Sequence, residues 1–326
     1  MKKNIAIIWG GYSSEKEVSE RSAAGIYSFI DKDRYHAYKV KIDRSSWEAE
    51  HEGTAYPVDK NDFSFTTGEK RIVFDFAYIT IHGTPGEDGL LQGYFDMLQI
   101  PYSNCGVLAS SLSFNKYVCN HFLKGSGVRI APSVCVRSGD TYDGEEIIKM
   151  LGLPLFVKPN LGGSSFAVTK VKKAGELVQA VSKAFGEAPE VIIEKYVAGT
   201  EVTCGCFETA KGFTVLPLTE VVTDNEFFDY DAKYNGQVQE ITPARIDERV
   251  AREIGQTTKD IYFRLGAKGI IRADYIVSEG QPVLLEVNTT PGMTQTSFIP
   301  QQVHAAGLSM TDVLSDIIET EYDKRR

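Results

Sequence analysis

The stretch Gly269-Ile-Ile-Arg-Ala-Asp-Tyr-Ile-Val-Ser-Glu-Gly-Gln-Pro-Val-Leu-Leu-Glu-Val-Asn288 predicts two apolar strands joined by a turn at 278–282. Side chains alternate between the two faces of a strand. One face is expected to hold Ile271, Ala273, Tyr275 and Val277 together with Val283, Leu285 and Val287. The other face is expected to hold Arg272, Asp274, Glu286 and Asn288. A register that pairs Val277 with Val283 sets Asp274 opposite Glu286.

The polar face of this hairpin predicts a metal site. Two carboxylates that face each other between apolar strands repel strongly unless a cation lies between them. Oxygen donors from Asp274, Glu286 and Asn288 suit Mg²⁺ or Mn²⁺, which can bind phosphate oxygens at the same time. The alternative is a structural ion pair with Arg272 on an exposed face. The hairpin alone leaves both interpretations open.

The segment Lys158-Pro-Asn-Leu-Gly-Gly-Ser-Ser165 lies between two predicted strands and is a candidate phosphate-binding loop. Its glycines let the backbone approach phosphates closely, and its serines add donors. Most loops of this composition are plain turns, and the segment is not a Walker A sequence. Lys116, Lys158 and Lys195 favour the phosphate interpretation, because a lysine in an apolar environment needs an anionic partner.

Three other loops follow predicted strands. In the loop 10–17, Glu15 could bind an ammonium group or simply cap the helix that follows. The loop His82–Gly89 is either part of a site or a tight acidic turn. Pro291 and Gly292 end the hairpin, where free backbone N–H groups can point at a developing negative charge, although most such sequences are only turns.

The order of predicted elements indicates an α/β protein in three parts. Strand, helix and strand at the start of the chain suggest a parallel α/β domain. We expect an N-terminal domain at 1–112, a central domain at 113–196 and a C-terminal domain at 197–326.

Composition limits the partners. The net charge of −9 argues against nucleic acid, because phosphate binding normally leaves a basic surface. No apolar run approaches the roughly 20 residues needed to span a bilayer. The apolar stretch 5–9 is too short for a signal peptide, and the five cysteines include no C-x-x-C pair. We therefore expect a cytoplasmic protein with reduced cysteines and no nucleic-acid or membrane partner.

Taken together and in order, these motifs resemble the D-alanine–D-alanine ligase family of the ATP-grasp superfamily, nearly from end to end. The resemblance is carried by Gly10-Gly-x-Ser-x-Glu15, His82-Gly-x-x-Gly-Glu-Asp-Gly89, Asn115-Lys116, Val157-Lys-Pro159, Gly163-Ser-Ser165, Ile193-Glu-Lys195, Asp229-Tyr-Asp-Ala-Lys-Tyr234, Arg272-x-Asp274 and Leu285-Glu-Val-Asn-Thr-Thr-Pro-Gly-Met293. The runs near Glu15, His82 and Tyr234 separate this family from ATP-grasp relatives that share only the nucleotide residues.

The resemblance implies an ATP-grasp fold of three α/β domains, with ATP held between the central and C-terminal domains. It also implies an enzyme that phosphorylates the carboxylate of one D-alanine and then joins the acyl group to a second D-alanine. The implied cofactors are ATP and two Mg²⁺ (or Mn²⁺), the implied pathway is peptidoglycan precursor synthesis, and the implied assembly is a homodimer.

The resemblance also assigns roles to individual residues. The expected ATP-binding residues are Lys116, Lys158, Glu194, Lys195, Val197, Glu201, Phe227, Ile276 and Leu285. The expected metal ligands are Asp274, Glu286 and Asn288. The expected catalytic residues are Glu15, Ser164, Tyr234, Arg272 and Gly292. The expected substrate-binding residues are His82, Lys233, Ser297 and Phe298.

Several positions differ from the usual family pattern. Gly162 replaces a common Gln or Glu, Phe166-Ala167 replaces a common Val-Gly, and Phe298 replaces a frequent leucine in the second subsite. The main alternative is therefore a D-alanine–D-lactate or D-alanine–D-serine ligase, although Tyr234 favours the dipeptide product. A more remote alternative is a non-catalytic nucleotide sensor on the same fold.

Overall fold

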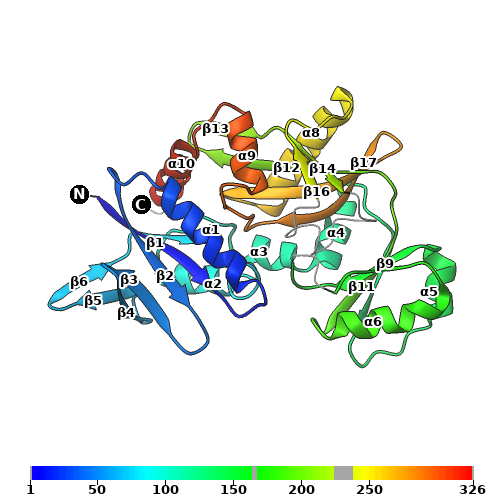
Figure 1. The fold of residues 1–326 in the computed structure, drawn as a ribbon, viewed down its shortest axis with the longest axis horizontal. Helices are drawn as coiled ribbons and strands as arrows, with labels where there is room; N and C mark the ends of the chain where they lie inside the picture. Colours follow the sequence, from blue (N-terminus) through cyan, green and yellow to red (C-terminus); the bar gives the residue numbers. More distant parts are fainter. Residues whose placement is uncertain (1, 164–166, 224–237, 325–326) are drawn as a thin grey trace.

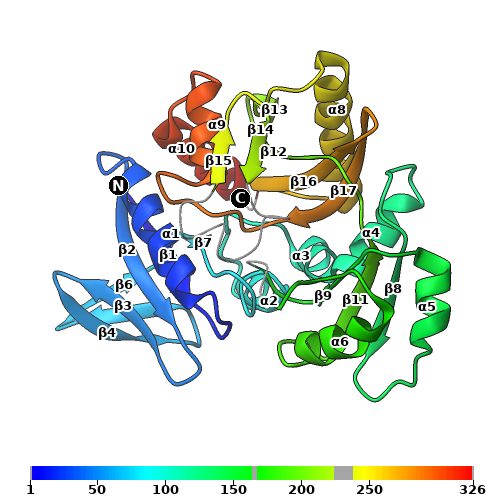
Figure 2. The ribbon, with the colours of Figure 1, turned by 45° about the vertical axis from the view of Figure 1, so that its right-hand side comes forward.

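The structure is a computed structural model that describes residues 2–163, 167–223 and 238–324. Three β-sheets with attached helices form an α/β architecture (Figure 1). In Figure 2 the C-terminal sheet lies above, and the N-terminal and central sheets lie below it on either side. Each sheet is built from strands within one of the three predicted ranges.

The N-terminal sheet is mixed. Its strand order is β6-β5-β4-β3-β2-β1-β7; β1 is parallel to β2 and β7, and the strands from β2 to β6 pair antiparallel. The strands are β1 (Lys3–Gly10), β2 (Tyr35–Ile42), β3 (Trp47–His51), β4 (Thr54–Asp59), β5 (Ser64–Thr67), β6 (Lys70–Val73) and β7 (Phe76–Ile79). The helices are α1 (Lys16–Phe29) and α2 (Leu90–Met97). The parallel unit was predicted, whereas the β3–β6 meander was not.

Gly10 shows why a glycine ends β1. Its φ of +106° lies in a region that favours glycine, and a Cβ there would collide with the Ile42 carbonyl at the end of β2. The Gly11 amide donates to that same carbonyl at 2.8 Å. The loop that carries Glu15 is therefore fixed against the sheet at its first residues.

The central sheet has the order β10-β9-β11-β8 and is antiparallel throughout. Its strands are β8 (Ser133–Arg137), β9 (Leu155–Pro159), β10 (Thr169–Val171) and β11 (Glu190–Lys195). Its helices are α5 (Gly144–Leu151), the short η1 (Ala174–Glu176) and α6 (Leu177–Phe185). Apolar residues of α5 and α6, among them Leu151 and Val181, pack with Leu155 and Ile193 into one core.

The C-terminal sheet has the order β15-β14-β12-β16-β17, with β13 paired to β12. Its strands are β12 (Thr200–Thr209), β13 (Gly212–Val215), β14 (Thr219–Thr223), β15 (Val238–Ile241), β16 (Ile270–Ser278) and β17 (Gln281–Asn288). The helices that follow or interrupt these strands are α8 (Glu248–Leu265), α9 (Phe298–Ala305) and α10 (Met310–Asp323).

Two helices follow the N-terminal sheet, α3 (Val107–Phe114) and α4 (Lys116–Lys124). Asn115 separates them with an extended backbone, and its side chain accepts from the Val118 amide as the N-cap of α4. Cys119 and Leu123 of α4 share a core with the C-terminal sheet, and the chain runs from α4 into β8 of the central sheet.

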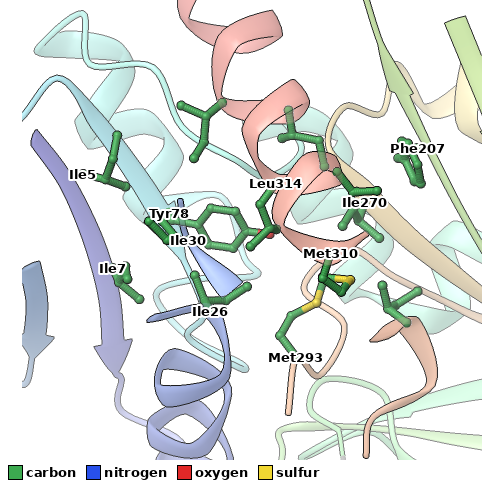
Figure 3. Packing of buried hydrophobic residues seen from close by; sticks show 14 of the residues in the cluster. Ile5, Ile7, Ile26, Ile30, Tyr78, Phe207, Ile270, Met293, Met310 and Leu314 are labelled. Carbon is green, nitrogen blue, oxygen red and sulfur yellow. The ribbon is translucent and has the colours of Figure 1, made fainter. Parts of the chain in front are cut away.

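A shared core joins the first and last parts of the chain. Figure 3 shows Ile26 of α1 and Ile30, which follows the end of α1, packed with Met310 and Leu314 of α10 beside strand residues such as Ile5. Polar contacts reinforce this joint, because Tyr35 donates to Glu319 of α10 at 2.7 Å.

All five cysteines are free, and four are buried. Burial raises the pKa of Cys105 to about 11 and that of Cys119 to about 12, so these thiols are poor nucleophiles at neutral pH. Within the described ranges, no helix is long and apolar enough to cross a membrane.

Candidate active site

Two adjoining cavities, of about 560 and about 880 Å³, lie where the three sheets meet. Every predicted site residue that the structure describes lines one or both of them. The cavities share the side chains of Glu15, Phe114, Lys116, Arg272, Glu286 and Phe298 together with Gly162 and Gly163. Of the predicted residues, Ser164, Phe227, Lys233 and Tyr234 lie outside the described residues.

The hairpin β16–β17 places Asp274 directly opposite Glu286, as predicted, but the predicted register at the turn is wrong. Val277 pairs with Pro282 rather than Val283. The turn has only two central residues, Glu279 and Gly280, both with positive φ, which is the short connection typical of hairpins. A bulge between Asp274 and Tyr275 on one side and Leu284 and Glu286 on the other restores the predicted pairing.

The bulge also changes which side chains face the cavity. Leu284 and Val287 lie in the core, whereas the neighbours Leu285 and Glu286 both line the larger cavity. The prediction that Val283, Leu285 and Val287 share one face is therefore wrong for Leu285. On β16 the expected alternation holds, since Arg272, Asp274 and Ile276 line the cavity and Ala273 lies in the core.

The acidic residues of the hairpin are paired with cations. Arg272 donates to both oxygens of Asp274, at 2.8 and 2.7 Å, and Lys116 lies 3.5 Å from Glu286. The ion pair anticipated as the alternative to a metal site therefore exists, but its side chains are only 12% and 11% exposed and border the cavity. Burial opposes the charge on Arg272, yet the Asp274 carboxylate raises the pKa of the guanidinium.

The donor set fits a phosphate-bound divalent ion better than a metal held by protein alone. Among the residues that the structure describes, no group of three or more His, Cys, Asp and Glu side chains could hold a metal. Asp274, Glu286 and Asn288 supply two carboxylates and an amide oxygen on adjacent strands. Mg²⁺ is typically bound by one or two carboxylates, with water and phosphate oxygens completing its shell.

The larger cavity combines apolar walls with buried charge. Lys158 of β9 forms an ion pair with Glu194 of β11 at 2.7 Å, and both side chains are nearly buried. Burial opposes the charge on Lys158, but Glu194 and then Glu286 raise the pKa of its ammonium group. The apolar lining includes Phe156, Val197, Ile276 and Leu285, so the cavity combines apolar surface suited to a ring with basic side chains suited to an anion.

The smaller cavity holds Glu15, which the alternative interpretation had assigned to helix capping. Glu15 is the N-cap residue of α1, but its side chain makes no capping hydrogen bond. Its carboxylate instead lies against Gly163, where a Cβ would be 2.9 Å from both oxygens. Gly163 of the glycine-rich loop and Glu15 of the loop 10–17 therefore meet in this cavity.

His82, Ser297 and Gly292 form the remaining wall of the smaller cavity. The His82 Nε2 lies 3.2 Å from the Ser22 hydroxyl, and burial lowers the pKa of the imidazole, so it is neutral at neutral pH. The Ser297 hydroxyl accepts from the Thr294 amide at 3.0 Å. A Cβ on Gly292 would lie 3.0 Å from that hydroxyl, so the backbone at Gly292 is directly beside it.

Several residues of the smaller cavity were not predicted as site residues. Among them are Val18, Arg21, Glu87, Glu240 and Gln301. Val18 and Arg21 follow Glu15 at helical spacing, a signal that could have identified them. Glu87 belongs to the His82–Gly89 motif, and its Oε2 accepts from the Gly83 amide at 2.6 Å. Burial, with help from Glu15, raises the pKa of Glu87 to about 8.

The chain matches two family descriptions. The family described as "D-ala D-ala ligase N-terminus" matches residues 4–105, and "D-ala D-ala ligase C-terminus" matches residues 122–319. A D-alanine--D-alanine ligase of Bacteroides fragilis is 60% identical over 324 residues, 99% of this chain and 100% of that protein. One of Parabacteroides distasonis is 61% identical over 328 residues, 100% of this chain and 99% of that protein.

Solved structures of ligases also resemble this chain over nearly its whole length. The VanG D-Ala:D-Ser ligase of Enterococcus faecalis has a TM-score of 0.84 at 31% identity, with 98% of this chain and 100% of that chain covered. The D-alanyl-alanine synthetase A of Vibrio cholerae has a TM-score of 0.88 at 26% identity, with 99% of each chain covered. A D-alanine--D-alanine ligase of Bacillus anthracis complexed with ATP has a TM-score of 0.80 at 29% identity, with 99% and 98% covered.

Proposed function

Because the chain belongs to the D-alanine–D-alanine ligase family, we propose that it joins two D-alanine molecules at the cost of one ATP. A carboxylate oxygen of the first D-alanine attacks the γ-phosphorus, ADP leaves, and an acyl phosphate remains. The amine of the second D-alanine then attacks the acyl carbon, phosphate leaves and the nitrogen loses a proton. The observation that carries this proposal is that Glu15, Arg272 and Glu286 border both cavities, so amino-acid and nucleotide sites share one reaction zone.

ATP is proposed to occupy the larger cavity. The adenine would lie between Ile276, Leu285 and Phe227 and contact Glu194, Lys195 and Val197, with the ribose at Glu201. Lys116, Lys158 and Lys233 would neutralise the phosphates. Catalysis by such a site consists mainly of positioning and charge neutralisation.

A divalent cation supplies charge neutralisation at the transferred phosphate when it is bound. We propose two Mg²⁺ (or Mn²⁺), with Asp274, Glu286 and Asn288 as their ligands. For Asp274 to serve as a ligand, Arg272 must share or release a carboxylate oxygen that it now binds. The freed guanidinium donors would then be available to the oxyanion formed when the amine attacks, together with the Gly292 N–H.

Glu15 is proposed to bind the ammonium group of the first D-alanine, in a hydrogen-bonded set with Ser164 and Tyr234. Ser297 and Lys233 would bind the carboxylate of the second D-alanine, and Phe298 would line its side-chain pocket. The neutral His82 would lie near the incoming amine. An uncharged imidazole adds no positive charge where an ammonium group must give up its proton.

The setting of the enzyme follows from the reaction. We propose that it acts in the cytoplasm in peptidoglycan precursor synthesis, and that domain boundaries lie at 112/113 and 196/197.

We also propose a homodimer. Leu90, Met97 and Leu108 on the contacting helices α2 and α3 are 64%, 79% and 76% exposed, an apolar surface that a second copy could cover. Sedimentation of wild type and Met97→Lys tests this: a wild-type monomer contradicts it.

The alternative D-lactate or D-serine ligase has one observation in its favour, namely the similarity to a D-Ala:D-Ser ligase structure. The test is ADP release by the purified protein with Mg-ATP and D-alanine, with product identified by mass spectrometry. L-alanine and mixtures of D-alanine with D-lactate or D-serine serve as comparisons. If product forms only in a mixture, the second substrate is D-lactate or D-serine rather than D-alanine. ATP binding without product in any mixture would leave the sensor alternative.

A further inference from the structure

An unassigned glutamine lies at the centre of the contact between α9 and the C-terminal sheet. Gln302 is fully buried, although it is polar and lines neither cavity. Its Oε1 accepts from the Gly205 amide at 3.0 Å, and its Nε2 donates to the Thr203 carbonyl at 3.0 Å and to the Thr219 hydroxyl at 3.1 Å. The carboxamide thus bonds at both ends to one strand.

The backbone of β12 explains why this glutamine is needed. Along one edge, β12 pairs with β14 at Glu201–Thr203 and with β13 at Cys206–Thr209. The gap between these two ladders lies at Cys204 and Gly205. A buried backbone N–H without a partner is costly, and Gln302 provides the partner that no strand provides.

The space for the glutamine exists because residue 205 is glycine. A Cβ at this position would lie 2.5 Å from Gln302 Oε1 and 2.5 Å from the Ile299 side chain. The end of a glutamine normally moves away at little cost, but here three hydrogen bonds hold it. Gly205 and Gln302 therefore act as a matched pair.

This pair is connected to the reaction zone. On its other edge, β12 pairs with β16, where Gly205 lies opposite Arg272. The Arg272 guanidinium in turn lies 5.3 Å from the centre of the Phe298 ring. Phe298 and Gln302 are four residues apart on α9 and so lie on the same face of the helix. The helix α9 thus contacts both members of one cross-strand pair: Gln302 binds Gly205, and Phe298 lies beside Arg272.

We propose that Gln302 is a positioning residue that holds α9, and with it Ser297 and Phe298, in place at the subsite of the second D-alanine. This inference rests on the proposed function and extends it to a residue outside both cavities. Loss of the Gln302 hydrogen bonds is therefore expected to displace only the subsite of the second D-alanine. The nucleotide cavity and Glu15 should stay in place.

The test uses Gln302→Met, which keeps the volume but removes the hydrogen bonds, with the exposed Gln256→Met as control. The rate as a function of D-alanine concentration gives separate KM values for the two subsites. We expect the KM of the second subsite to rise about tenfold, while those of the first subsite and ATP change less than about twofold. Equal changes in all three values would mean a purely structural role, and no change would also overturn the proposal.

A double-mutant cycle tests the matched pair itself. Gly205→Ala alone should raise the second KM because its Cβ displaces the Gln302 carboxamide. In the Gln302→Ala background, the same substitution should raise this KM by a smaller factor, because only the close contact with the Ile299 side chain remains. Additive effects would contradict the pair. Wild-type protein without ligase activity would refute the proposed function, whereas active wild type with an unaffected Gln302→Met would refute this inference alone.

Discussion

Arg272 and Asp274 are neighbours on one face of β16, and the guanidinium binds both oxygens of the carboxylate, at 2.8 and 2.7 Å. One residue of this pair is the proposed oxyanion donor and the other is a proposed metal ligand. The guanidinium compensates the charge of the Asp274 carboxylate in a nearly buried position. In the proposed mechanism, metal binding by Asp274 and release of Arg272 toward the substrate are therefore linked.

The metal assignment predicts that Glu286→Gln abolishes turnover. A neutral amide cannot hold two divalent cations, and it leaves Lys116 without the carboxylate 3.5 Å away. The loss should reach at least about a thousandfold in kcat at saturating Mg²⁺. Glu279→Gln, an exposed change in the turn of the same hairpin, should be silent. Near-normal turnover of Glu286→Gln would contradict the assignment.

The buried pair Lys158–Glu194 predicts that thermal stability and ATP binding respond differently to substitutions. Lys158→Met leaves the Glu194 carboxylate buried without its partner, so Tm should fall and the KM for ATP should rise by about tenfold or more. Lys158→Met/Glu194→Gln removes the uncompensated charge and should restore much of the Tm. The KM for ATP should stay high in the double variant, because the phosphates still lack their cation. Recovery of ATP binding together with Tm would contradict the role of Lys158.

Glu87 predicts a specific pH dependence of stability. Its pKa is raised from an ordinary 4.5 to about 8, mainly by burial, so the folded protein keeps a proton that the unfolded chain has lost. The stability from this group is present below its unfolded pKa and is lost as pH rises through its folded pKa. Glu87→Gln stays neutral and should avoid this loss.

The measurement is Tm at about pH 5.5 and about pH 9. Relative to wild type, Glu87→Gln should gain about 2–4 °C between the two pH values, the shift that roughly 1 kcal/mol produces in a large domain. Glu69→Gln, an exposed change in the N-terminal sheet, should show no such gain. Parallel pH profiles for wild type and Glu87→Gln would mean that Glu87 is ionised in the folded protein at neutral pH.

Phe298 predicts the selectivity of the second subsite. Phe298→Leu shortens the side chain and removes the ring 5.3 Å from the Arg272 guanidinium. The subsite should widen, so that larger D-amino acids compete better with D-alanine by about three- to tenfold. Competition assays with product ratios from mass spectrometry measure this effect. An unchanged ratio would remove Phe298 from the selection of the second substrate.

Much of the site was accessible from the sequence because its residues lie in short motifs at strand ends. Alternation along β16 correctly predicted Arg272 and Asp274 on one face. The bulge at Leu285 was not predictable, because it depends on a two-residue turn whose length the sequence did not define. Gln302 carried no signal either, since a gap between β13 and β14 exists only after the sheet has formed.

In the fold, too, some elements could be predicted from the sequence and others could not. The order of strand, helix and strand predicted at the start of the chain indicated the parallel pairing in the N-terminal sheet. The meander β3–β6 was missed, since its short strands mix polar and apolar residues and several are half-exposed.

The most direct test of the proposed reaction is the transfer of oxygen from D-alanine to phosphate. D-alanine carrying ¹⁸O in both carboxylate oxygens is incubated with the protein and Mg-ATP, and the released phosphate and dipeptide are analysed by mass spectrometry. The acyl-phosphate route predicts one ¹⁸O atom in phosphate for each dipeptide formed, with ADP as the other product. Dipeptide accompanied by unlabelled phosphate would contradict activation of the carboxylate by phosphorylation.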